Sequence, residues 1–431
     1  MTATDTSRGN NTSGHVTKWL FKKEDNQMRH TFRRVVFTMF LLSVVFSLGL
    51  GSNAAASEVL KFGMSIPLSG PAAPWGVGLD RALKMVCEKN NKAGGIKVGG
   101  KTYTLKAISY DCKGLPSEAA AQATKLVYKD KVKYILGGVI AATGEAILPV
   151  TTPEKVITTS CWWGKNILSP KRPYSFRQTV SQYEIVPAFY EWITKKRPDL
   201  KTLAIVSPND TSGWDTAAAI REEAKKYGIK IVADEFYERS TKDMSPFLTR
   251  IIAQKPDFID LGGAPPGNGA IILKQLHALG YKGQKVWSCG TDPKLMLKLV
   301  GPACKGVWFS YGHDMEGPNG TDTTRRICKE YREKYSDDFS IPSMTEYAIA
   351  EVILQAMKEA NSLNTDDVVK AIEKKKMFDT SYGPFYLTGK KEYGIDRQFI
   401  HQMMVCETTG TELKEIAWLK MPGLKKPKFN K

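Results

Sequence analysis

The sequence predicts an α/β protein built on two doubly wound sheets. Its 431 residues exceed the size at which one hydrophobic core usually divides into two. From Leu60 onward, short apolar runs alternate with amphipathic helical stretches, which is the pattern of parallel βαβ units. The same pattern begins again at Leu203, so we expect a second sheet of the same kind.

The first series of elements opens with a strand, and its helices carry their apolar residues on one face, as at Leu79, Leu83 and Val86. Gly94 stands where the first helix ends, and Ser117 is placed to cap the second. The expected elements are a strand over 60–66, a helix ending at 93–95, a strand over 103–110, a helix over 117–128 and a buried strand over 133–138.

The second series repeats this arrangement. Gly228 is placed to end its first helix. The expected elements are a strand over 203–207, a helix over 214–227, a strand from 229, a strand over 258–263, a helix over 270–279 and a strand over 285–288.

The last part of the chain, after residue 312, mixes helices with short strands. The expected elements are helices over 323–335 and 344–360, a helix capped by Thr365, and β segments near 385 and over 399–405. No low-complexity linker separates the two series. We therefore expect the chain to return to the first lobe and cross again through short hinges.

The N-terminus has the three parts of a secretory signal peptide. Residues 28–34 are basic, 35–50 are apolar and 54–56 are small. The apolar run is short for a membrane anchor and leads into polar sequence, so we expect cleavage after Ala56 and a leader of residues 1–56. Translation from Met28 is an alternative start. No Cys follows the run, which favours a soluble periplasmic protein over a lipoprotein.

The net charge of +18 does not by itself indicate a nucleic-acid-binding protein. The leader holds seven Lys or Arg and three Asp or Glu, so +14 remains in the exported chain. These charges lie on helices among acidic residues, as in 221–226, which is typical of solvated faces. We expect no nucleic-acid partner.

Seven cysteines lie in the mature chain, and an odd count leaves at least one free thiol. Export permits disulfides, with Cys87 and Cys112 as the first candidate pair and Cys289 with Cys304 as the second. There is no C-x-x-C motif, and the histidines are few and scattered. No metal site and no cofactor are expected.

Motifs of common enzyme classes are missing, so catalysis is not expected. The glycine-rich segment 262–269 lacks the Lys-Ser/Thr that holds phosphate and magnesium, and Cys161 has no histidine near it in sequence. Trp162 and Trp163 are consecutive and cannot both point into one core, so one should face a crevice. Ligands of such sheets bind beyond the strands' carboxyl ends. The loops there begin at Pro67, Val139, Thr158, Pro208, Gly262 and Gly290.

Several segments together resemble the leucine/isoleucine/valine-binding proteins, a family of type I periplasmic solute-binding proteins of ABC transporters. The segments are Pro67-Leu68-Ser69-Gly70-Pro71, Trp75-Gly76, Ala93-Gly94-Gly95-Ile96, Tyr110-Asp111, Gly137-Gly138-Val139, Gly290-Thr291-Asp292-Pro293 and Tyr382-Gly383-Pro384-Phe385. The resemblance covers most of the mature chain. It implies two lobes joined by a three-crossover hinge. The implied bounds are 58–178 plus 313–388 for lobe 1 and 179–312 plus 389–431 for lobe 2.

The resemblance also implies roles for single residues. Trp75 stands where the family places an aromatic against the ligand's side chain, and Asp292 where it places the carboxylate that pairs with an α-ammonium. Alternatives are core packing for Trp75 or Trp162 and a helix N-cap for Asp292. The family's serine-rich carboxylate loop is 141–143 here, and its Ala-Ala-Thr segment is 160–162, which adds an indole. The candidate ligand-binding residues are Ser69, Trp75, Ala141, Thr143, Ser160, Trp162, Ser212, Ala264 and Asp292.

The function implied by the resemblance is binding without catalysis. The expected solute is a small carboxylate, either a branched-chain amino acid or an aromatic acid. The expected partners are ABC permease subunits in the inner membrane, with their cytoplasmic ATPases, and the receptor is expected to be a monomer. A periplasmic ligand sensor for a signalling partner is the alternative.

Overall fold

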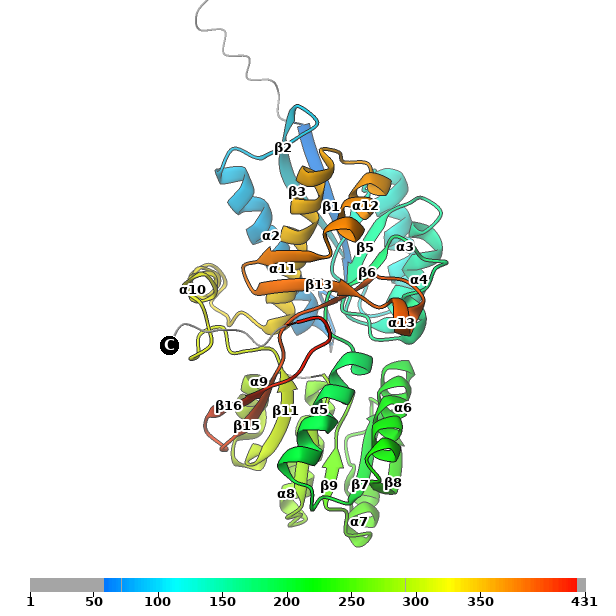
Figure 1. Ribbon diagram of the computed structural model, residues 1–431, viewed down its shortest axis with the longest axis vertical. Helices are drawn as coiled ribbons and strands as arrows, with labels where there is room; N and C mark the ends of the chain where they lie inside the picture. The colour runs from blue at the N-terminus through cyan, green and yellow to red at the C-terminus, as the bar shows by residue number, and fades with distance from the viewer. Residues whose placement is uncertain (1–57, 71, 291, 425–431) are drawn as a thin grey trace, which may run out of the picture. The chain divides into compact units, whose positions relative to one another are not determined.

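The computed structural model describes residues 58–70, 72–290 and 292–424 (Figure 1). The predicted signal peptide lies outside these residues. Among the helices of the described part, none is long and apolar enough to cross a membrane.

The first sheet has nine strands, and its centre is parallel. Antiparallel pairs occur only at its two ends among the described strands. In spatial order the strands are β12 (Met377–Thr380), β13 (Gly383–Thr388), β14 (Gln398–Ile400), β6 (Ser175–Arg177), β5 (Ile157–Ser160), β4 (Tyr134–Ile135), β1 (Glu58–Ile66), β3 (Lys101–Asp111) and β2 (Ile96–Val98).

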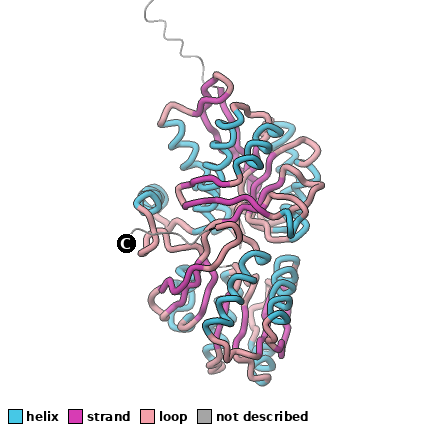
Figure 2. Tube along the Cα trace, in the orientation of Figure 1, coloured by secondary structure: helices cyan, strands magenta, loops and turns pink. Residues whose placement is uncertain are grey.

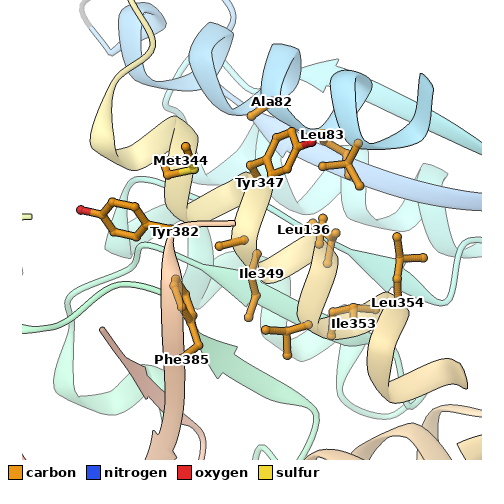
Figure 3. Packing of buried hydrophobic residues seen from close by; sticks show 14 of the residues in the cluster. Ala82, Leu83, Leu136, Met344, Tyr347, Ile349, Ile353, Leu354, Tyr382 and Phe385 are labelled. Atoms are coloured by element: carbon orange, nitrogen blue, oxygen red, sulfur yellow. The ribbon is translucent and has the colours of Figure 1, made fainter. Parts of the chain in front are cut away.

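Helices cover both faces of this sheet (Figure 2). One face carries α2 (Ala73–Lys92), α11 (Ile341–Ala360) and α12 (Thr365–Lys375), and α10 (Asp322–Tyr335) adds to the same core. The other face carries α3 (Pro116–Thr124) and α4 (Ala141–Thr151). In Figure 3, Ala82 and Leu83 of α2 lie over Tyr347 of α11.

The second sheet has seven strands and is parallel except at one edge. In spatial order they are β16 (Leu413–Trp418), β15 (Met404–Thr408), β11 (Val307–Tyr311), β10 (Gln284–Trp287), β9 (Phe258–Asp260), β7 (Thr202–Pro208) and β8 (Lys230–Tyr237). One face carries α5 (Gln182–Lys196) and α6 (Thr211–Lys226). The other carries α7 (Ser245–Ala253), α8 (Pro266–Ala278) and α9 (Pro293–Val300). Two such sheets confirm the predicted fold class.

The chain passes between the sheets three times, after β6, after β11 and after β14. The last passage differs from the predicted boundary at 388. It falls between Ile400 and Met404, because α13 (Lys390–Tyr393) and β14 come before it and β14 pairs in the first sheet. Phe399 explains the difference, since its ring packs against Phe176 and Phe385 of that sheet.

The predicted disulfides are wrong, because all seven cysteines are free thiols. Cys87 lies in the core under α2, whereas Cys112 lies in the core on the opposite face of the same sheet. Cys289 and Cys304 are likewise in the cores on opposite faces of the second sheet. In both pairs the sheet stands between the two sulfurs. Burial raises the pKa of the Cys87 thiol to about 12, so it is inert at neutral pH.

Candidate functional site

A cavity of about 550 Å³ opens among elements of both sheets. Its walls include the first turns of α2, α9 and α11. All three crossover segments contribute as well, through Thr179 after β6, Gly312 after β11 and His401 after β14. A molecule in this cavity therefore touches the parts of the chain that connect the sheets.

Trp75 lines the cavity from the first turn of α2, as its predicted role requires. Pro74 stands in that same turn, where its fixed φ favours the start of a helix. The helix packs tightly at Gly76, where a Cβ would lie 1.9 Å from the carbonyl oxygen of Pro67. At Gly78 a Cβ would lie 2.4 Å from Ser343 Oγ of α11. These two close approaches fix the backbone of the start of α2, which carries Trp75.

Of the consecutive tryptophans, one lies in the core and the other lines the cavity. The structure corrects the assignment within this pair, because Trp162 is only 2% exposed and packs against Gly138 and Gly144. A Cβ at either glycine would come within 2.3 Å of the indole. Trp163 lines the cavity instead, and its buried Nε1 has no hydrogen-bond partner. Because consecutive side chains point in opposite directions, the sequence predicts that one of the two tryptophans lies in the core and the other lines a crevice. It does not predict which of the two lines the crevice.

Asp292 lines the cavity from the start of α9 and also caps that helix. Its Oδ1 accepts hydrogen bonds from the backbone N–H groups of Lys294, at 2.8 Å, and Leu295, at 3.4 Å. Burial is the largest influence on the carboxyl and raises its pKa, against hydrogen bonds from Tyr311 and the two N–H groups. Both the predicted ligand role and the N-cap alternative are compatible with this placement.

Ion pairs occupy the basic side chains along the wall. Arg81 Nη1 lies 3.0 Å from Asp337, and Lys294 Nζ lies 2.7 Å from Asp314. Lys298 of α9 pairs with Asp338, which follows α10. Because each of these three cations has an acidic partner, an anionic solute must compete with a carboxylate or bind to backbone N–H groups.

The other predicted site residues do not line this cavity. Ser69 is exposed and donates to Asp111, and Thr143 is buried with its N–H and hydroxyl both donating to the carbonyl of Ile140. Ser212 lies in the first turn of α6. Their part in ligand binding stays a prediction. The same holds for the buried residues Ala141, Ser160 and Ala264.

The family model described as periplasmic binding protein matches residues 59–412, and the chain belongs to this family. The family consists of substrate-binding proteins, not enzymes. A leucine-, isoleucine-, valine-, threonine- and alanine-binding protein of Pseudomonas aeruginosa is 23% identical over 336 residues, which are 78% of this chain and 87% of that one.

Solved structures share the fold. An isoleucine complex of a branched-chain amino acid transporter substrate-binding protein from Streptococcus pneumoniae superposes with a TM-score of 0.74 at 20% identity, over 85% of this chain and 100% of that chain. A solute-binding protein of an ABC transporter from Rhodopseudomonas palustris, in complex with 3,4-dihydroxybenzoic acid, superposes with a TM-score of 0.71 at 22% identity. The match covers 85% of this chain and 99% of that chain.

Proposed function

We propose that this protein is the periplasmic substrate-binding component of an ABC importer and holds one small carboxylate solute in the cavity. The observation that carries the proposal is the composition of the walls, which include helices packed on each of the two sheets and all three crossovers. A solute that contacts elements packed on both sheets favours one arrangement of them by its differential affinity. A permease that recognises this arrangement would receive only loaded receptors.

The proposed solute is a branched-chain amino acid or an aromatic acid. Similar proteins bind solutes of each of these two classes. The cavity also has aromatic walls that suit the apolar or aromatic part of such a solute, formed by Trp75, Trp163, Tyr311 and Phe339. A sensor that passes ligand occupancy to a signalling partner is the second candidate, since it needs the same cavity. Adjacent genes for permeases and ATPases would favour transport, and a histidine kinase gene would favour sensing.

A thermal-shift screen with amino acids and aromatic acids tests the proposal. We expect a one-to-one complex with a Kd in the micromolar range, about 8 kcal/mol, and recovery of the solute unchanged. X-ray scattering should show a smaller radius of gyration with ligand than without it. Chemical conversion of the solute, or no binding across the screen, would contradict the proposal.

Trp75→Ala is expected to weaken binding of the best solute at least tenfold. The indole covers an apolar face of the solute, and removal of such a contact costs about 1 to 3 kcal/mol. Titration calorimetry measures the change. Trp214→Ala is the matched control, because Trp214 is 51% exposed on α6 and does not line the cavity. Equal losses in both variants would contradict a specific role for Trp75.

Export is expected to remove the leader and leave a chain that starts Ser57-Glu58-Val59. N-terminal sequencing of the protein from the periplasmic fraction checks this proposal. Full-length protein embedded in the membrane would contradict it.

A further inference from the structure

A group of buried polar side chains lies directly behind one wall of the cavity. Thr179 and Thr345 line the cavity, and each is next in sequence to a fully buried polar residue, Gln178 or Glu346. The Gln178 amide donates to Glu346 Oε2 at 2.6 Å, which joins the first crossover to α11. The Cys161 thiol lies beside Gln178, Thr179 and Thr345.

Three atoms of this group have no nitrogen or oxygen hydrogen-bond partner, and the donor beside Thr179 and Gln178 is the weak S–H of Cys161. They are Thr179 Oγ1, Gln178 Oε1 and Glu346 Oε1. Glu346 also lacks a cation, because no Lys or Arg of the described residues pairs with it, and burial raises its pKa to about 8. Buried polar atoms in native proteins are almost always hydrogen-bonded, and an unmet one is costly. Thr179 itself lines the cavity, whereas Gln178 and Glu346 lie behind the wall that Thr179 and Thr345 form. The three atoms therefore point to a polar group that enters from the cavity at this wall.

We propose that Gln178, Thr179, Thr345 and Glu346 form a second polar subsite of the cavity, which binds a hydroxyl group of the solute. The proposal rests on the proposed function and narrows it to a carboxylate solute that also carries a hydroxyl. A purely apolar side chain or ring would leave these atoms unpaired.

The pattern of donors and acceptors favours a hydroxyl. At neutral pH the raised pKa keeps the Glu346 carboxyl protonated. Its Oε2 already accepts from Gln178, so the proton resides on Oε1, which is free to donate. Gln178 Oε1 is a free acceptor, and the Thr179 hydroxyl can do either. A hydroxyl both donates and accepts, whereas an ammonium only donates and a methyl group does neither.

Two matched pairs of probes test the subsite by titration calorimetry at pH 7. Threonine and valine differ by a hydroxyl in place of a methyl group, and 4-hydroxybenzoate differs from benzoate by one hydroxyl. In whichever pair of probes binds to the protein, we expect the hydroxylated member to bind at least about tenfold more tightly. The reason is that a site that hydrogen-bonds a hydroxyl group rejects the analogue that lacks one. Equal affinities within a bound pair would overturn the subsite and leave the proposed function standing. Failure of all four probes to bind would overturn the subsite, and the proposed function would fall as well only if no solute of the thermal-shift screen binds.

Glu346→Met separates a binding role from a structural one. Methionine has a similar volume and removes the buried carboxyl, but it also removes the acceptor of the Gln178 amide. These two effects oppose each other, so we expect little net change in the melting temperature of the ligand-free protein, together with a roughly tenfold loss for the hydroxylated probe alone. Glu346→Gln retains a donor and an acceptor and should keep most of the preference. A lower melting temperature of the methionine variant with equal losses for both probes would show a structural role and overturn the proposal.

Thr158→Val is the matched control for these variants. Thr158 Oγ1 is also buried without a partner, but Thr158 lies within β5 and is not bonded to Gln178 or Glu346, and neither it nor its two sequence neighbours line the cavity. We expect the control to leave the preference for the hydroxylated probe unchanged. A loss of preference as large as that of Glu346→Met would show that the effect is not specific to the subsite, and would overturn it.

Discussion

Arg177→Met is expected to lower the free energy of unfolding by about 3 to 5 kcal/mol, since one partner of a buried charged network is removed. Arg177 ends β6 and is completely buried. Its guanidinium donates to the carbonyl oxygens of Trp162 and Gly164 and to the side chains of Tyr393 and Gln398. All four acceptors lose a donor in the variant.

The same network contains a buried carboxylate. Glu184 accepts from the Tyr393 hydroxyl at 2.9 Å, and burial raises its pKa while Arg177 opposes that rise. Without the guanidinium, the carboxyl has to take up a proton or remain as an unpaired buried charge. Because the folded-state pKa of Glu184 would then lie further above that of the unfolded chain, the loss of stability should grow as the pH rises above the ordinary range of a glutamate.

Arg177 also positions the cavity wall, because the two carbonyls that it binds flank Trp163. We expect the variant to lose solute affinity as well as stability. Denaturant unfolding and calorimetry measure the two effects. Arg250→Met is the control, since the Arg250 side chain is 64% exposed and its ion pair with Glu235 is 3.7 Å long, and it should change stability by less than about 0.5 kcal/mol. A loss below about 1 kcal/mol for Arg177→Met would contradict the role assigned to the network.

The periodic parts of the fold could be predicted from the sequence, because a strand or helix repeats its apolar pattern over many residues. The strand at 203–207 and the helix ending at Gly228 are examples, and the structure has β7 and α6 there. The last crossover was placed too early because β14 has only three residues, and its pairing depends on aromatic contacts with distant strands.

The part of the candidate site that could be predicted rests on the family resemblance, which implies roles for Trp75 and Asp292. Trp75 and Asp292 lie at helix starts, and both line the cavity. Glu346 and Arg177 carry no such signal, since a glutamate in a helix or an arginine at a strand end is usually solvated. Their burial follows from the packing of α11 and of the loop after β5, which join residues more than a hundred positions apart.

Asp292→Asn is expected to separate the two proposed solute classes. If the solute is an amino acid, its ammonium loses a charged partner in the cavity, and the affinity should fall by about 2 to 5 kcal/mol. If the solute is an aromatic acid without an ammonium, Asp292 repels it, and the variant should bind equally well or better.

The fold should tolerate this substitution. Asparagine caps helices about as well as aspartate, so the hydrogen bonds to the N–H groups of Lys294 and Leu295 can be kept. A melting temperature close to the native value would confirm that the cap is intact and that a change in affinity belongs to the cavity. Calorimetry with the best amino acid and the best aromatic acid gives the answer. A native affinity for an amino acid solute in the Asn variant would contradict the pairing of Asp292 with the ammonium, and would leave the proposed subsite of Gln178, Thr179, Thr345 and Glu346 as the polar groups that select the solute.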